Sequence, residues 1–154
     1  ALLITAQIII FFILLLFNFP SSKIFLGDGG SYLFGAIITL NIIETNNANP
    51  QISSFFFCTL LFYLFFEVFF SFFRKIYQKK SPLLPDGNHL HMLIHKKMIK
   101  KNYLTSLFIN VIYLFLIMPG FYFMENPLIS RIWFFSLLLF YLISYYLISR
   151  KSNT

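Results

Sequence analysis

The chain alternates between long apolar runs and short polar stretches. The apolar runs consist mainly of Phe, Leu, Ile and Tyr, and their lengths predict membrane-spanning helices. The spans are expected at about residues 1–17, 31–43, 52–73, 103–123 and 132–148. The polar stretches between them leave no room for a separate soluble domain. The pattern therefore predicts one all-α membrane domain over residues 1–154, a polytopic helix bundle with about five transmembrane segments.

The second apolar run, residues 31–43, is short for a span. Its 13 residues make about 20 Å of helix, against a hydrocarbon core of ~30 Å. The sequence GDGGS at its start predicts a break over Gly27–Gly30, with the helix beginning near Asp28 or Ser31. A helix start and a carboxylate together suit a magnesium–phosphate site. The alternative is that Asp28 only caps the helix and the glycines form a turn.

Composition and charge set the environment and the orientation. With 58% hydrophobic and 11% charged residues, the chain lies outside the range of water-soluble domains. Of its 12 Lys and Arg residues, all but Arg131 fall on one side of the predicted spans. The loops 18–30 and 74–102 and the C-terminus are therefore predicted to be cytoplasmic. The net charge of +7 then reflects topology and not nucleic-acid binding, although loop 74–102 also suits anionic headgroups.

Glu67 stands among aromatic residues in the third predicted span. An acid at a helix centre costs about 2.5–3.5 kcal/mol, so a partner is expected. Helical spacing places Glu67, Ser71, Arg74 and Gln78 on one polar stripe that runs toward the predicted cytoplasmic end. Two interpretations remain open: a structural link between Glu67 and Arg74, or one wall of a polar cavity.

The stretch SPLLPDGNHLHMLIHKK, residues 81–97, carries all three histidines. Its two prolines exclude a regular helix at the start, and a helix is expected to begin near Asp86–Asn88. His91 and His95 then share a face, with His89 off that face at the helix entry. This spacing is poor for zinc, and imidazoles beside lysines suit phosphate or uracil contacts better. The alternative is an ordinary solvated basic loop.

Together, KIFLGDGGSYLFGAIIT and SPLLPDGNHLHMLIHKK resemble the C-terminal half of a known family over about residues 1–101. The family is that of the polyprenyl-phosphate N-acetylhexosamine-1-phosphate transferases, glycosyltransferase family 4. These bacterial membrane enzymes transfer a sugar 1-phosphate from a UDP-sugar to undecaprenyl phosphate and release UMP. Their lipid-linked products begin cell-wall and lipopolysaccharide O-antigen biosynthesis. The branch most similar to this chain uses UDP-N-acetylglucosamine.

The resemblance implies a role for each matching residue. It implies catalytic roles for Asp28, His89 and His91, with Asp28 also binding Mg²⁺, and substrate binding by Asp86, Arg74, Lys75, Ser31 and Glu67. It further implies a multi-pass protein of the bacterial cytoplasmic membrane. The implied partners are a UDP-N-acetylhexosamine, undecaprenyl phosphate and the lipid bilayer, without nucleic acid; a homo-oligomer is compatible with this.

The chain departs from the family pattern at several points. Met92 stands where some members have a histidine, and Lys75 stands where others have an arginine. The family's aspartate pair is absent, because the only aspartates are Asp28 and Asp86. We therefore expect a C-terminal fragment that is inactive alone, with activity in the full-length parent. Two alternatives stay open: a non-catalytic membrane scaffold or lipid-binding pseudo-transferase, and a transporter subunit with Glu67 as its ion site.

Overall fold

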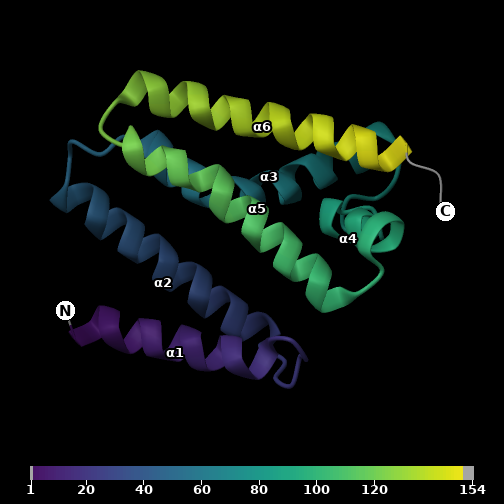
Figure 1. Ribbon diagram of the computed structural model, residues 1–154, viewed down its shortest axis with the longest axis horizontal. Coiled ribbons are helices and arrows are strands. Elements are labelled where there is room, and N and C mark those ends of the chain that lie inside the picture. The colour runs from purple at the N-terminus through teal and green to yellow at the C-terminus, as the bar shows by residue number, and fades with distance from the viewer. Residues whose placement is uncertain (1, 151–154) are drawn as a thin grey trace. The chain divides into compact units, whose positions relative to one another are not determined.

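The computed structural model describes residues 2–150, and these residues form helices connected by loops, without a strand. The helices are α1 (Leu2–Asn18), α2 (Gly27–Ala48), α3 (Ser54–Tyr77), α4 (Leu90–Ile94), the π-helix η1 (His95–Ile99), α5 (Asn102–Tyr122) and α6 (Pro127–Arg150) (Figure 1). The all-α prediction is confirmed. The chain divides into two compact units, Ala1–Glu44 and Thr45–Thr154, which are described in turn.

The first unit pairs α1 with most of α2. The Asn41 side-chain amide donates a hydrogen bond to Gln7 Oε1 at 2.8 Å. The rings of Phe11 and Phe34 lie 4.7 Å apart between centroids. A polar bond and an aromatic contact therefore both contribute to the pairing of these helices.

Helix α2 is longer than the sequence indicated. The prediction placed a break at Gly27–Gly30 and the helix start near Asp28 or Ser31; the helix begins at Gly27 and runs for 22 residues to Ala48, about 33 Å at the standard rise. Gly27 has φ +66, which glycine adopts at no steric cost, and the other two glycines continue the first turn. Asp28 also lies in that turn, where its negative charge interacts favourably with the helix dipole. The helix therefore begins next to Asp28, one of the two predicted start positions, and continues five residues beyond the apolar run 31–43.

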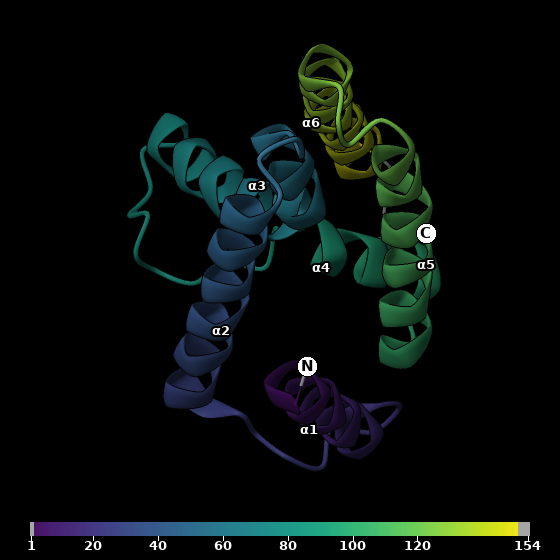
Figure 2. The same cartoon turned by 90° about the vertical axis from the view of Figure 1, so that its left-hand side faces the viewer.

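The second unit is built on α3, which packs most extensively against α6. Helices α5 and α6 form an antiparallel hairpin (Figure 1), and Trp133 Nε1 donates to the carbonyl of Leu116 across it at 3.1 Å. The Tyr113 hydroxyl on α5 donates to the Leu60 carbonyl on α3. Figure 2 shows α4 between α3 and α5; this short helix packs against α5 and α6, and Leu90 at its start is bonded to α3.

Among the described residues, three helices are long and apolar enough to cross a membrane: α3, α5 and α6. Helix α1 is apolar but shorter. Few side chains are fully buried, Leu137 being one at 1% exposure, whereas many large apolar side chains such as Phe65 and Leu139 face outward. Such a surface is unfavourable in water and suits a hydrocarbon environment. The structure is thus consistent with an all-α membrane bundle.

Gly120 on α5 provides a test of how closely α5 packs on α3. A Cβ atom there would lie 3.5 Å from Thr59 Cγ2 and 3.6 Å from the Phe56 ring, so alanine fits but a larger side chain does not. We expect Gly120→Leu to lower the free energy of unfolding by about 1–3 kcal/mol, and Gly120→Ala to change it by less than about 1 kcal/mol. Unfolding in detergent followed by Trp133 fluorescence measures both.

Gly35→Leu is the matched control, because nothing lies within 4 Å of a Cβ atom at Gly35. A Gly120→Leu protein as stable as this control would contradict the close approach of α5 to α3.

Candidate functional site

Glu67 connects three elements of the second unit. Its side chain is buried, with the residue 7% exposed, near the middle of α3. The Oε1 atom accepts hydrogen bonds from His89 Nδ1 at 3.0 Å and from the Leu90 backbone N–H at 2.9 Å. The Oε2 atom accepts one from the Tyr141 hydroxyl at 2.9 Å. One carboxylate thus joins α3 to the end of the loop, to the start of α4 and to α6.

The start of α4 depends on this carboxylate. The helix begins at Leu90, later than the predicted Asp86–Asn88, because His89 is still extended at φ −68 and ψ 149. His89 is the N-cap residue, but its side chain forms no capping bond. Glu67 accepts the Leu90 N–H instead, supplying from another helix the acceptor that a capping side chain normally provides.

Arg74, about two turns after Glu67 on the same face of α3, binds the loop. Its Nη2 lies 2.8 Å from Asp86 Oδ2 and donates to Ser71 Oγ at 3.0 Å. Within the described part of the chain, Arg74 Nε and Nη1 are buried with no hydrogen-bond partner. A buried guanidinium with unused donors is well suited to bind an additional anion such as a phosphate group.

The charge state of Asp86 follows from this pair. Partial burial disfavours its charged form, but the hydrogen bond and charge of Arg74 outweigh burial and lower the pKa of Asp86, with smaller contributions from the Asn88 backbone and Lys75. Asp86 is therefore a carboxylate at neutral pH.

Lys75 holds the middle of the same loop. Its ammonium group donates to the backbone carbonyls of Leu84 at 2.7 Å and Pro82 at 3.2 Å, and the residue is 7% exposed. The loop that follows α3 is thus bound to that helix at successive points, by Lys75, Arg74 and Glu67.

The three histidines have different surroundings. The rings of His89 and His91 are nearly parallel, with centroids 5.6 Å apart, and His89 Nε2 lies 4.0 Å from Asp86 Oδ1. His91 is exposed, yet partial loss of hydration lowers its pKa. The negative charge of Glu67 acts to raise the pKa of His91, and the neighbouring His89 acts to lower it. His95 Nδ1 lies 3.4 Å from the Thr105 hydroxyl. His89 is the imidazole that the structure combines with the two acids.

The polar stripe predicted along α3 is present for most of its length. Glu67, Ser71 and Arg74 are buried, and Lys75 joins them, but Gln78 is exposed at the end of the helix. The link between Glu67 and Arg74 that the sequence left open is not the arrangement found, because each side chain pairs with a different part of the loop.

Tyr141 was not identified from the sequence. It is one of nine tyrosines, and a tyrosine in an apolar span ordinarily fills space. It is 2% exposed and packs against the rings of Phe66 and Phe70. Only the need of Glu67 for a donor could have indicated it.

Asp28 and Ser31 lie in the first unit. Asp28 is exposed in the first turn of α2, and the Ser31 hydroxyl donates to the Gly27 carbonyl at 2.9 Å. In the described residues no group of three metal-ligating side chains comes together. A single carboxylate nevertheless fits Mg²⁺, which commonly takes one or two carboxylates and completes its shell with water and substrate phosphates. Asp28 fits that mode as one oxygen ligand.

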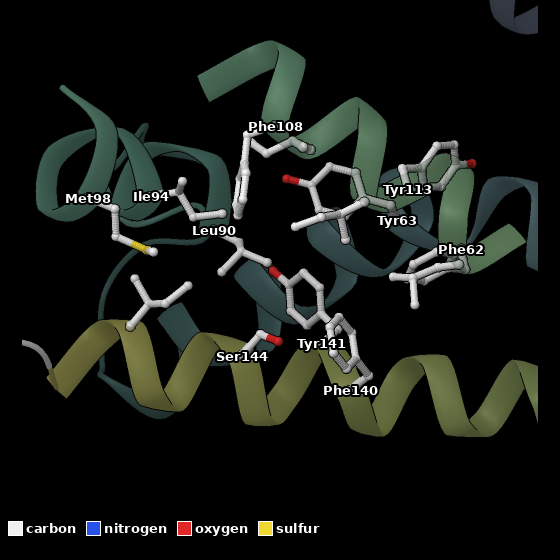
Figure 3. Close-up of a pocket in the computed structure, with 14 residues that line it drawn as sticks. Phe62, Tyr63, Leu90, Ile94, Met98, Phe108, Tyr113, Phe140, Tyr141 and Ser144 are labelled. Atoms are coloured by element: carbon white, nitrogen blue, oxygen red, sulfur yellow. The ribbon is translucent and has the colours of Figure 1, made fainter. Parts of the chain in front are cut away.

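An apolar cavity of about 200 Å³ adjoins the polar cluster. Leu90 and Tyr141 line it (Figure 3), and both residues also bond to Glu67. The rest of the wall comes from α3, α4, η1, α5 and α6. The polar cluster around Glu67 and the apolar cavity therefore share Leu90 and Tyr141.

The fold and this cluster define an all-α membrane protein with a buried polar site along the second half of its third helix. Residues 1–46 match the family model described as glycosyl transferase family 4. The chain is also 34% identical over 83 residues to the undecaprenyl-phosphate alpha-N-acetylglucosaminyl 1-phosphate transferase of Thermotoga maritima. That match covers 54% of this chain and 27% of the relative's length. No solved structure matches the chain.

The two matches confirm the family resemblance that the motifs indicated. The family model covers the segment with Asp28 and Ser31.

The Arg74–Asp86 pair should control the order of the loop. We expect Asp86→Asn to raise amide hydrogen exchange across residues 79–89, because it leaves a buried guanidinium without its counter-charge. The loss of local stability should approach the low end of the roughly 3–5 kcal/mol typical of broken buried pairs, since Asp86 keeps 16% of its side chain exposed. Exchange as fast in the wild type as in the variant would contradict this anchor.

The same pair predicts a pH dependence. Because the folded pKa of Asp86 is lowered, its stabilising contribution is complete above the ordinary value of 3.8 and is lost as the pH falls through the lowered pKa. We expect the protection factors of the loop amides, which are corrected for the intrinsic pH dependence of amide exchange, to be constant from neutrality down to about pH 4 and to fall below that. Asp86→Asn should abolish the fall; a wild-type transition above pH 5 would contradict the assignment.

Proposed function

We propose that this chain forms part of an enzyme that transfers N-acetylglucosamine 1-phosphate from its UDP-sugar to undecaprenyl phosphate, releasing UMP. The observation that carries the proposal is the convergence of Asp86 and His89 with buried Arg74 and Glu67 at the end of an apolar helix bundle. The family match and the name of the Thermotoga maritima relative support the reaction class and the sugar.

The chemistry required is mainly electrostatic. Phosphoryl transfer needs in-line placement of the reacting groups and neutralisation of charge on the transferred group and the leaving nucleotide. The unused Nε and Nη1 donors of Arg74 would bind phosphate oxygens, and His89 and His91 would donate or accept protons beside them. Asp86 keeps Arg74 oriented and is a substrate-side acceptor for the nucleotide.

A magnesium ion, when bound, would neutralise and orient the diphosphate. Asp28 is the residue of this chain proposed to hold it, as one carboxylate ligand at the exposed start of α2. Ser31, one turn further along the same helix, would contribute a hydroxyl to the same polar surface.

The membrane location follows the same reasoning. The proposed lipid acceptor arrives within the bilayer, so its phosphate can meet a polar site only at the membrane edge. The basic residues around that site support a cytoplasmic orientation in a bacterial inner membrane, where the UDP-sugar is available. Initiation of cell-wall or O-antigen glycans is the corresponding pathway step, and a homo-oligomer would be compatible with it.

The family's aspartate pair is not among these 154 residues. We therefore assign the activity to the product of the complete reading frame that encodes them, and propose that the 154-residue chain is inactive alone.

The decisive experiment measures radiolabelled sugar-phosphate transfer to undecaprenyl phosphate in membranes that contain this complete product. We expect Asp28→Asn and His89→Ala to lower the rate about a hundredfold, the usual scale for losing one group that stabilises transferred charge. EDTA should abolish transfer and added Mg²⁺ should restore it.

Glu125→Gln, in the exposed turn between α5 and α6, is the matched control and should leave the rate unchanged. Transfer and Mg²⁺ dependence that are unaffected by the site variants would instead support a scaffold or pseudo-transferase.

A further inference from the structure

The side-chain bonds of Glu67 indicate a role different from the substrate binding that the family resemblance implies. Both of its oxygens already accept hydrogen bonds from described residues, namely His89, Leu90 and Tyr141. The residue is 7% exposed, so little of it can reach a ligand. A carboxylate so enclosed can act on a substrate only through the groups it holds.

We propose that Glu67 is a positioning residue that fixes the tautomer and orientation of His89, so that His89 presents Nε2 to the substrate. This inference rests on the proposed transferase function. A neutral imidazole carries one proton, and a carboxylate can only accept. The bond from Nδ1 to Glu67 Oε1 at 3.0 Å therefore places the proton on Nδ1 and leaves Nε2 as an acceptor.

The surroundings of Nε2 suit a proton acceptor. Asp86 Oδ1 lies 4.0 Å from it, beyond hydrogen-bond distance but close enough to stabilise a positive charge on the ring. The groups beside the ring are Glu67 from α3, Asp86 from the loop and His91 from α4, and Arg74 is paired with Asp86. Tyr141 reaches it from α6 only through Glu67.

Leu90 makes this arrangement testable with a conservative variant. Its backbone N–H donates to the same Oε1 atom at 2.9 Å and must keep an acceptor when the side chain changes. In Glu67→Gln this N–H holds the amide oxygen at the Oε1 position, so the acceptor for His89 remains. In Glu67→Leu the acceptor is lost, and the ring is released toward the Nε2–H form that prevails in free histidine.

The test is the ¹⁵N spectrum of histidine-labelled complete protein in nanodiscs at about pH 8.5, two units above the ordinary histidine value. The difference from His89→Gln identifies the His89 signals. We expect the Nδ1–H tautomer in the wild type, in Glu67→Gln and in Tyr141→Phe, and its loss in Glu67→Leu. A wild-type ring in the Nε2–H form would overturn the proposal without any variant, as would an unchanged tautomer in Glu67→Leu.

Transfer kinetics supply the second readout. We expect kcat to fall about 10–100-fold in Glu67→Leu, the range typical of lost orienting partners, and less than tenfold in Glu67→Gln, with KM for the UDP-sugar little changed in both. Equal losses of kcat in the two variants would overturn the positioning role. A wild-type protein with the Nδ1–H tautomer but no transfer would overturn the proposed function alone, so the two failures are distinguishable.

Discussion

The structure of the second unit depends on a carboxylate placed where hydrocarbon surrounds the helix. Burying an acid in a span costs about 2.5–3.5 kcal/mol on insertion scales, and the cost persists unless the lone pairs are satisfied. Glu67 meets this constraint with three donors from two separate segments: the imidazole of His89 and the backbone N–H of Leu90 at the start of α4, and the phenol of Tyr141 on α6. The need to satisfy one side chain thereby fixes how α4 and α6 approach α3.

Helix α3 consequently acts as both a membrane span and a support for the loop that follows it. The N-terminal half of α3 packs through buried aromatic and hydroxyl side chains, such as Phe62 and Thr59. The C-terminal half carries Glu67, Arg74 and Lys75, each bound to a later position of the chain. A loop held in this way lies on a rigid element, which is how sites that need precise geometry are usually built.

Much of this organisation could be predicted from the sequence. The apolar runs identified the long helices, and helical spacing identified the buried stripe of Glu67, Ser71 and Arg74. Both features follow from local periodicity and from the cost of burying charge. The partners of that stripe could not be predicted, because Tyr141 lies 74 residues from Glu67 and only tertiary packing brings them together.

The full extent of α2 and the start of α4 were also beyond local reasoning. Glycines normally weaken helices, yet in α2 they belong to the first turn. Gly27 has the positive φ with which the backbone enters this helix. The start of α4 was misplaced for a complementary reason. The acceptor for its first backbone N–H is supplied by a residue 23 positions earlier, so no sequence motif next to α4 indicates where the helix begins.

The lysines of this unit illustrate how a count of charges differs from the electrostatic field that a membrane surface experiences. Lys75, Lys96 and Lys97 direct their ammonium groups to the backbone carbonyls of Leu84, Gly87 and Ser149, respectively. Such cations work as internal crosslinks between loop, π-helix and the end of α6, and neutralising them by acetylation would loosen the fold as well as remove charge. Lys75 is 7% exposed and therefore adds little to the charge that a membrane surface meets, whereas Lys96 remains exposed despite its bond and keeps its attraction to anionic groups.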